Sequence, residues 1–172
     1  MASVSEVQCE VDSIRILHWN IHSWRDESGA PNLESVIGLV SATSPHVVSL
    51  VEVDETWEAP SALNELANCC GYASIFAPAF EFGADQPAGG FGNALLTNLP
   101  IVAVQQRQLV WPPRFYDGTE PSEPRSVVLA KLRVSAQLFW VGSTHLPRYD
   151  GDARTQALSR LARLVESSAV IG

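Results

Sequence analysis

The sequence predicts a mixed α/β or α+β fold, in which a mixed sheet is covered on both faces. Two observations support this prediction. Strand-like and helix-like segments alternate in two βαβ-like passages, and a run of consecutive strands follows them. The 172 residues suit one domain, and the shares of apolar residues (46%) and charged residues (17%) are those of an ordinary globular protein. Many folds share this order of elements, so periodicity alone does not decide among them.

Apolar runs and helical spacing place the first elements. Residues 14–19 (IRILHW) are rich in β-compatible side chains and predict a strand. Asn32 is placed to cap a helix over residues 33–43, whose apolar positions fall on one face and which Pro45 ends. Residues 46–53 (HVVSLVEV) form a nearly continuous apolar run, as expected of a strand that is buried on both faces.

The later elements follow from turn residues and from periodicity. Glycine-rich and proline-rich stretches predict two long loops, and a short turn predicts a hairpin. In chain order, we expect a helix at 61–69, a strand at 72–77, a loop at 81–92, strands at 91–97 and 101–110, a loop at 111–124, a hairpin of 125–134 with 137–144, and a helix from Asp152.

The charge of the chain limits its function. The net charge is -8, which argues against a protein that holds nucleic acid through a strong basic surface. An enzyme with an anionic substrate is not excluded, because a bound cation can supply positive charge locally.

The compartment is predicted from the cysteines and the amino terminus. Three cysteines without C-x-x-C spacing form neither a disulfide framework nor a zinc site. Residues 1–13 lack the basic and apolar regions of a secretory signal and are interpreted as an amino-terminal tail. No run reaches the length of a membrane span. We therefore expect a cytoplasmic protein whose single domain occupies residues 14–172.

Polar side chains stand where three predicted strands end. Asn20 follows the first strand, Glu52 interrupts the second apolar run, and His145 follows the sequence FWVGST. Open sheets usually place their sites at the carboxyl ends of strands. Each of these side chains also costs free energy to bury without a partner. We expect the three residues to share a polar cavity.

These residue types suit a magnesium-dependent site for phosphoesters. Mg²⁺ takes oxygen ligands, commonly one or two carboxylates, and Glu52 supplies a carboxylate. Asn20 offers an oxygen and an amide donor to orient a ligand. His145 is suited to donating a proton or a hydrogen bond to a phosphate oxygen. Arg125 is suited to binding a phosphate with two parallel hydrogen bonds.

Taken singly, each residue has a structural alternative. Glu52 is equally typical of a salt-bridged residue at a strand end, and Asn20 is an ordinary turn former. His145 equally fits a hydrogen-bonded structural histidine, and Arg125 a pair with a nearby carboxylate. His22 lies close enough to Asn20 to line the same cavity, but only proximity in the sequence supports this.

Six short segments occur in a characteristic order. They are IRILHWNIHSW (14–24), PHVVSLVEVD (45–54), GFGNALLTNLPI (90–101), EPRSVVLAKL (123–132), FWVGSTHLPR (139–148) and RTQALSRL (154–161). Together they resemble the endonuclease/exonuclease/phosphatase superfamily, the fold of pancreatic-type deoxyribonuclease, abasic-site endonucleases, neutral sphingomyelinases and inositol-polyphosphate 5-phosphatases. The resemblance implies a four-layer α/β/β/α sandwich of two packed sheets.

The resemblance also implies roles for five residues. Glu52 would be a ligand of Mg²⁺ (or Mn²⁺), and Asn20 would orient the metal site or the phosphate. Asn93 would hold the phosphate. His145 would stabilise the pentacovalent phosphorus or assist the leaving group, and Arg125 would line the site. The substrate would be a phosphoester within nucleic acid, a phospholipid or a small phosphate ester.

Two further segments of the superfamily, "G-D-x-N" and "S-D-H", do not occur in the sequence. They would supply two aspartates, an asparagine and the histidine that activates water. We therefore expect a domain that is truncated before its last strands and hydrolyses phosphoesters poorly or not at all alone. The alternative is a truncated or degenerate non-catalytic module, or a half-domain that needs a partner to complete its sheet.

Overall fold

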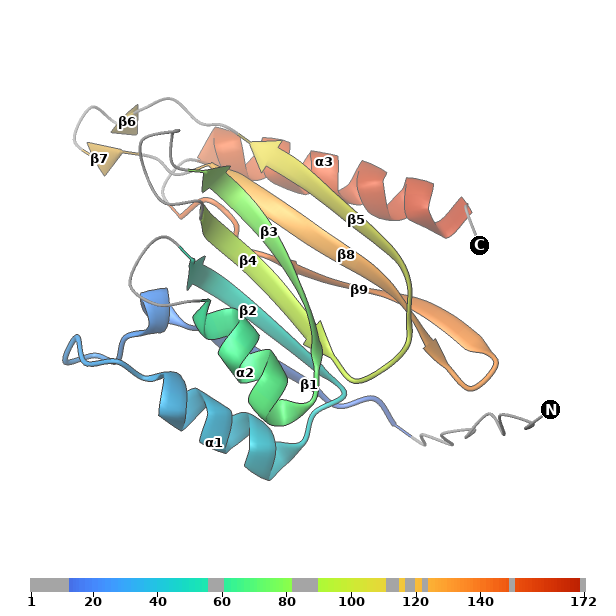
Figure 1. The fold of residues 1–172 in the computed structure, drawn as a ribbon. Coiled ribbons are helices and arrows are strands. Elements are labelled where there is room, and N and C mark those ends of the chain that lie inside the picture. Colours follow the sequence, from blue (N-terminus) through green and yellow to red (C-terminus); the bar gives the residue numbers. More distant parts are fainter. Residues whose placement is uncertain are drawn as a thin grey trace.

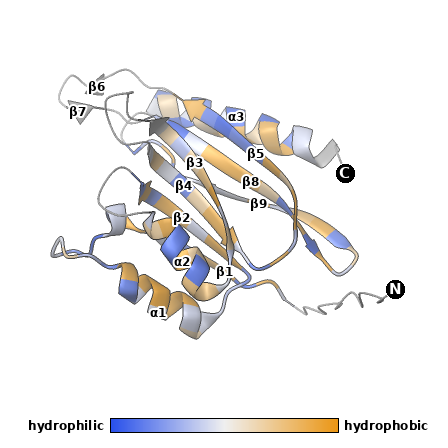
Figure 2. Ribbon diagram, in the orientation of Figure 1, coloured by the Kyte–Doolittle hydropathy of each residue, from blue (hydrophilic) through white to orange (hydrophobic). Residues whose placement is uncertain are grey.

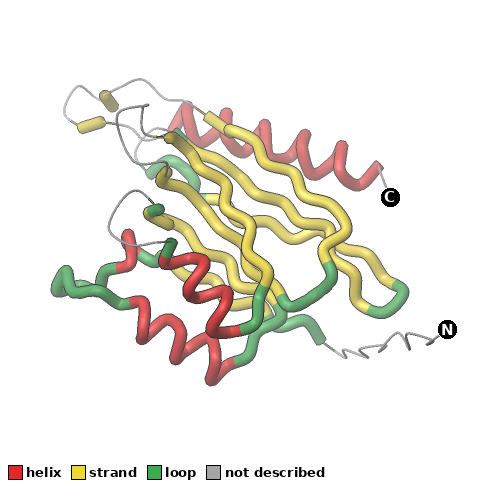
Figure 3. Tube along the Cα trace, in the orientation of Figure 1, coloured by secondary structure: helices red, strands yellow, loops and turns green. Residues whose placement is uncertain are grey.

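A computed structural model of the chain describes residues 13–55, 61–81, 90–110, 115–116, 120–121, 124–148 and 151–170. In these residues, helices lie on two sides of a pair of sheets (Figure 3). The first sheet holds four strands in the order β1-β2-β4-β3. β1 and β2 are parallel, and the other neighbours are antiparallel. Its strands are β1 (Ile16–Asn20), β2 (Val47–Asp54), β3 (Ala73–Glu81) and β4 (Gly90–Thr97).

The second sheet holds three antiparallel strands in the order β5-β8-β9. Its strands are β5 (Ile101–Val110), β8 (Arg125–Val134) and β9 (Gln137–Thr144), and a separate short ladder joins β6 (Phe115–Tyr116) to β7 (Glu120–Pro121). The helices are α1 (Leu33–Thr43), α2 (Ala62–Cys70), α3 (Gly151–Val170) and the short η1 (His22–Trp24).

Three hydrophobic clusters show how the layers stack. The first joins α1 and α2 to the outer face of the first sheet, with Val40, Leu66 and Val48 in contact. The second fills the space between the two sheets, and the third joins the second sheet to α3. Figure 1 shows α1 and α2 on one side of the strands and α3 on the other. The four-layer α/β/β/α sandwich expected from the resemblance is confirmed.

Burial explains which sequence patterns became which elements. β2 is buried along most of its length, as its continuous apolar run predicts, and both β2 and β8 are largely hydrophobic in Figure 2. In α2, the hydroxyl of Ser61 accepts a hydrogen bond from the backbone N–H of Asn64 (3.1 Å), and Gly71 ends the helix in a left-handed conformation. The hairpin of β8 and β9 has the predicted bounds.

Two local predictions were wrong. Asn32 precedes α1 but makes no side-chain cap; its amide donates instead to the carbonyl of Arg25 (2.9 Å). The bounds predicted for the loop over residues 81–92 were too wide, because Glu81 belongs to β3 and Gly90 to Gly92 belong to β4. Residues 82–89 lie outside the described part of the chain. Gly92 is a close-packing position: a Cβ there would lie 2.2 Å from the carbonyl oxygen of Ala77 on β3.

In the part of the chain that the structure describes, none of the helices is long and apolar enough to cross a membrane.

Candidate active site

Glu52 leaves the β2 ladder at a bulge. The pairing with β4 passes from Val51 opposite Asn93 to Val53 opposite Gly92, so Glu52 is the extra residue. Its φ is +57°, a left-handed conformation that costs free energy for a residue with a side chain. The bulge turns the Glu52 carboxylate out of the alternation of the strand, while Val51 and Val53 stay buried on either side.

Two histidines approach the Glu52 carboxylate. The Nδ1 atom of His22 lies 3.1 Å from Oε2, and the Nδ1 atom of His145 lies 3.6 Å from Oε1. The side chains of Glu52 and His145 are partly buried, with exposed fractions of 24% and 30%, whereas His22 is 67% exposed. The carboxyl end of β2, η1 and the turn after β9 lie at the same end of the molecule, at the left in Figure 1.

Arg125 joins this cluster from the start of β8. Its Nη1 atom lies 3.3 Å from Nδ1 of His145, and the residue is only 8% exposed. A guanidinium can only donate, so Nδ1 of His145 accepts in this contact and the ring proton resides on Nε2. At 3.6 Å, the contact of the same Nδ1 with Glu52 is too long for a hydrogen bond. Nε2 is therefore the nitrogen that carries the donor proton of the neutral ring.

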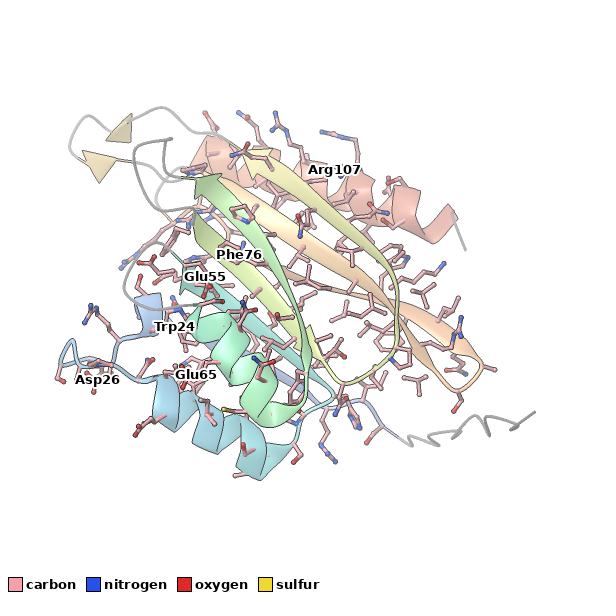
Figure 4. All side chains as sticks on the ribbon, in the orientation of Figure 1. Trp24, Asp26, Glu55, Glu65, Phe76 and Arg107 are labelled. Carbon is pink, nitrogen blue, oxygen red and sulfur yellow. The ribbon has the colours of Figure 1, made fainter. Side chains whose placement is uncertain are left out.

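A left-handed turn holds His22 in place. The φ angles of His22, Ser23 and Trp24 are +48°, +54° and +61°, a run that L-residues rarely adopt. Asn20 accepts a hydrogen bond from the backbone N–H of His22 through Oδ1 (3.1 Å). The buried Trp24 donates from Nε1 to the carbonyl of Asp54 (3.0 Å), which ties the turn to the end of β2. Figure 4 shows Trp24 and Glu55 near this end.

Asn20 and Asn93 lie beside the cluster, and their described hydrogen bonds are to His22 and to Ser126. Asn20 shapes the turn, as its structural alternative predicted, and its described contact is with His22 rather than with Glu52. Asn93 is 2% exposed and donates from Nδ2 to the carbonyl (3.0 Å) and the hydroxyl (3.1 Å) of Ser126. That pair of bonds ties β4 to β8, and Asn93 pairs across the sheet with Val51, the residue before Glu52. The roles of both asparagines in metal or phosphate binding stay predictions.

Of the predicted residues, the structure thus brings Glu52, His145 and Arg125 into contact and places Asn20 and Asn93 next to them. It also brings His22 to the site. In the sequence, only the position of His22 two residues after Asn20 had pointed to such a place. The contact needs the unusual turn, and the turn has no glycine to reveal it.

The donor set fits Mg²⁺ or Mn²⁺ in part. Glu52 supplies one carboxylate, and such ions commonly take one or two, with water and phosphate oxygens as the other ligands. Across the described ranges, no group of three His, Cys, Asp or Glu side chains is arranged to hold a metal ion.

The sequence profile of the Endonuclease/Exonuclease/phosphatase family matches residues 17–169, a range that includes every member of the cluster. The chain belongs to this family. A comparison with curated proteins finds no match.

Solved structures share the fold, and the first two below are named as endonuclease/exonuclease/phosphatase proteins. The protein from Beutenbergia cavernae is 21% identical with a TM-score of 0.62, and the match covers 88% of this chain and 43% of that one. The Leptotrichia buccalis protein is 14% identical with a TM-score of 0.67, over 88% and 61% of the two chains. TDP2 from D. rerio, complexed with single strand DNA product, is 18% identical with a TM-score of 0.52, over 88% and 52%.

At these identities, the likeness shows the fold alone. The chain spans between 43% and 61% of the lengths of these three structures.

Proposed function

We propose that the protein that contains this chain hydrolyses phosphoester bonds with the help of Mg²⁺ or Mn²⁺, in the cytoplasm. The observation that carries the proposal is the convergence of a carboxylate, an imidazole and a guanidinium at one end of the two sheets. Glu52 comes from the bulge in β2, His145 from the turn after β9 and Arg125 from the start of β8. Membership of the family supports the reaction class.

Glu52 would hold the divalent cation, which when bound neutralises charge on the phosphoryl oxygens. His145, with its proton on Nε2, would donate a hydrogen bond to a phosphoryl oxygen or a proton to the departing oxygen. Arg125 holds the imidazole in that tautomer and adds a positive charge beside it. Asn20 would orient the site through the turn that it forms, and Asn93, opposite Val51 on β4, would hold the phosphate.

The reaction is tested on the intact protein that contains residues 14–172. Hydrolysis of bis-p-nitrophenyl phosphate, p-nitrophenyl phosphate, a phospholipid and a single-stranded oligonucleotide is measured with Mg²⁺, with Mn²⁺ and with EDTA. The oligonucleotide is included because the D. rerio TDP2 structure contains single strand DNA product. We expect turnover of at least one phosphoester with either ion and none with EDTA. Equal turnover with and without EDTA would contradict metal dependence.

We further propose that the 172 residues alone turn over poorly, because the "G-D-x-N" and "S-D-H" segments do not occur in them. The purified chain is assayed under the same conditions. Robust metal-dependent turnover by the purified chain would overturn this proposal.

One observation favours the second candidate, a half-domain that needs a partner. Among the described strands, β1 and β9 lie at sheet edges; Ile16 on β1 is 54% exposed, and Leu138 on β9 is 46% exposed. Open edges that carry apolar side chains favour association with another chain. Size-exclusion chromatography and limited proteolysis decide between the candidates. A compact, monomeric, protease-resistant chain would count against the half-domain.

A further inference from the structure

A second polar feature lies away from the candidate active site. A groove of about 290 Å³ runs between β5 and α3, on the outer face of the second sheet. Figure 4 shows Arg107 on β5 beside α3, across the molecule from Trp24 and Glu55. The groove is lined mainly by Arg107 and Leu109 of β5 and by Arg160, Arg163, Leu164 and Ser167 of α3.

The groove concentrates positive charge in an acidic protein. The sequence has 11 Lys and Arg against 19 Asp and Glu, yet three arginines line this one groove. Among the described residues, none of the three guanidinium groups makes an ion pair with a carboxylate. Arg160 and Arg163 are also three residues apart on α3, where like charges repel one another. An anion in the groove would relieve this repulsion.

Two of the arginines are held in place by the protein backbone. Arg160 donates from Nη1 to the carbonyl of Leu109 (2.6 Å), and Arg107 donates from Nη1 to the carbonyl of Gln106 (2.7 Å). Each guanidinium keeps further N–H donors for a ligand. Because these bonds fix the side chains before a ligand arrives, less conformational entropy is lost on binding.

We propose that this groove binds an anion that carries adjacent phosphate groups. Arginine pairs with phosphate oxygens through two parallel hydrogen bonds, and three arginines match the charge of neighbouring phosphates better than that of a single carboxylate. Leu109 and Leu164 offer apolar contact to the rest of the ligand. Pyrophosphate compounds and consecutive backbone phosphates of a nucleic-acid strand share this chemistry. The site is separate from the Glu52 cluster and does not depend on the proposed hydrolysis.

The test is binding of inorganic pyrophosphate and of a short single-stranded oligonucleotide to the whole chain, in EDTA, by calorimetry and fluorescence anisotropy. Arg163→Ala is the main variant, because no hydrogen bond of its side chain is lost, and Arg160→Ala is the second. Arg133→Ala is the matched control. Arg133 is exposed on β8, and its substitution removes the same charge outside the groove. Circular dichroism and thermal melts establish that each variant is folded.

We expect Arg163→Ala and Arg160→Ala each to weaken binding by about tenfold, while Arg133→Ala changes it little. For the oligonucleotide, each lost arginine should reduce the slope of log K against log salt by about 0.7. Binding of both ligands, or of either alone, supports the proposal and identifies the source of the phosphates. The proposal is overturned if neither ligand binds. It is also overturned if Arg133→Ala weakens binding as much as Arg163→Ala. Arg125→Ala, at the candidate active site, is measured in the same way, and the proposal is overturned if this variant alone weakens binding.

Discussion

Nη1 of Arg125 lies 3.3 Å from Nδ1 of His145, and this contact places the proton of the neutral imidazole on Nε2. Arg125 opens β8 and His145 follows β9, so the register between these two strands sets the contact. Thr144 strengthens this register by donating from its hydroxyl to the carbonyl of Ser126 (2.9 Å). The tautomer of neutral His145 thus depends on the pairing of β8 with β9.

The tautomer of His145 is the first prediction. With Arg125 donating to Nδ1, neutral His145 should carry its proton on Nε2, and Arg125→Met should lose this preference. Two-dimensional ¹⁵N–¹H spectra at a pH where the imidazole is neutral distinguish the two tautomers. A wild-type spectrum with the proton on Nδ1 would show that the inferred contact is not made in solution.

The close approach of β3 and β4 at Gly92 gives a stability prediction. Gly92→Ala would place a Cβ 2.2 Å from the backbone carbonyl of Ala77, so we expect a loss of about 2 kcal/mol or more in the free energy of unfolding. Gly38→Ala in α1 is the matched control, since no atom lies within 4 Å of its added Cβ. It should stabilise the helix by about 0.5–1 kcal/mol. Urea denaturation measures both. Equal urea midpoints for Gly92→Ala and Gly38→Ala would show that β3 and β4 accommodate the added methyl group without loss of stability.

The turn that presents His22 depends on Trp24. Trp24→Phe keeps an aromatic ring but loses the hydrogen bond from Nε1 to the carbonyl of Asp54, so it should cost about 1 kcal/mol and shift the NMR signals of His22. Trp140→Phe is the comparison, because it loses the equivalent bond to the carbonyl of Ser168 (3.1 Å) in another part of the fold. It should cost similar stability and leave His22 unchanged. Identical NMR signals of His22 in the wild type and in both variants would show that the Trp24 hydrogen bond does not hold the turn.

The stability of the loop after this turn should depend on pH through the Asp26 carboxylate. Its carboxylate accepts hydrogen bonds from the Ser28 hydroxyl (2.6 Å) and from the backbone N–H of Ala30 (3.0 Å), with Asp26 labelled in Figure 4. The Ser28 bond, followed by the Ala30 bond, lowers the pKa of Asp26 from its ordinary value of 3.8. A lowered folded-state pKa means that the stabilisation is present above the ordinary pKa and is lost as the pH falls through the folded-state pKa.

Ser28→Ala should therefore move the pKa of Asp26 back toward 3.8, as measured by NMR titration of its carboxyl carbon. An unchanged titration curve would mean that the hydroxyl bond does not hold the carboxylate.

Several elements could be predicted from the sequence because local patterns determine them. The buried β2 run and the β8–β9 hairpin are examples. The four-layer arrangement needed the resemblance of six segments, since periodicity does not say which sheet a strand joins. Gly92 fell in both the predicted loop 81–92 and the predicted strand 91–97, because a glycine required by a close approach of strands looks the same in sequence as a glycine in a loop. His22 could not be placed, because its contact with Glu52 depends on backbone conformations that the residue types disfavour.

The most direct test of the central claim is the Mg²⁺-dependent kcat for a phosphodiester, compared between the intact protein and its Glu52→Gln variant. This substitution keeps the size of the side chain and removes the negative charge that would hold the cation. We predict that kcat falls by about a hundredfold or more, with thermal stability close to that of the wild type. A Glu52→Gln variant with wild-type kcat and undiminished sensitivity to EDTA would contradict the assignment of the site.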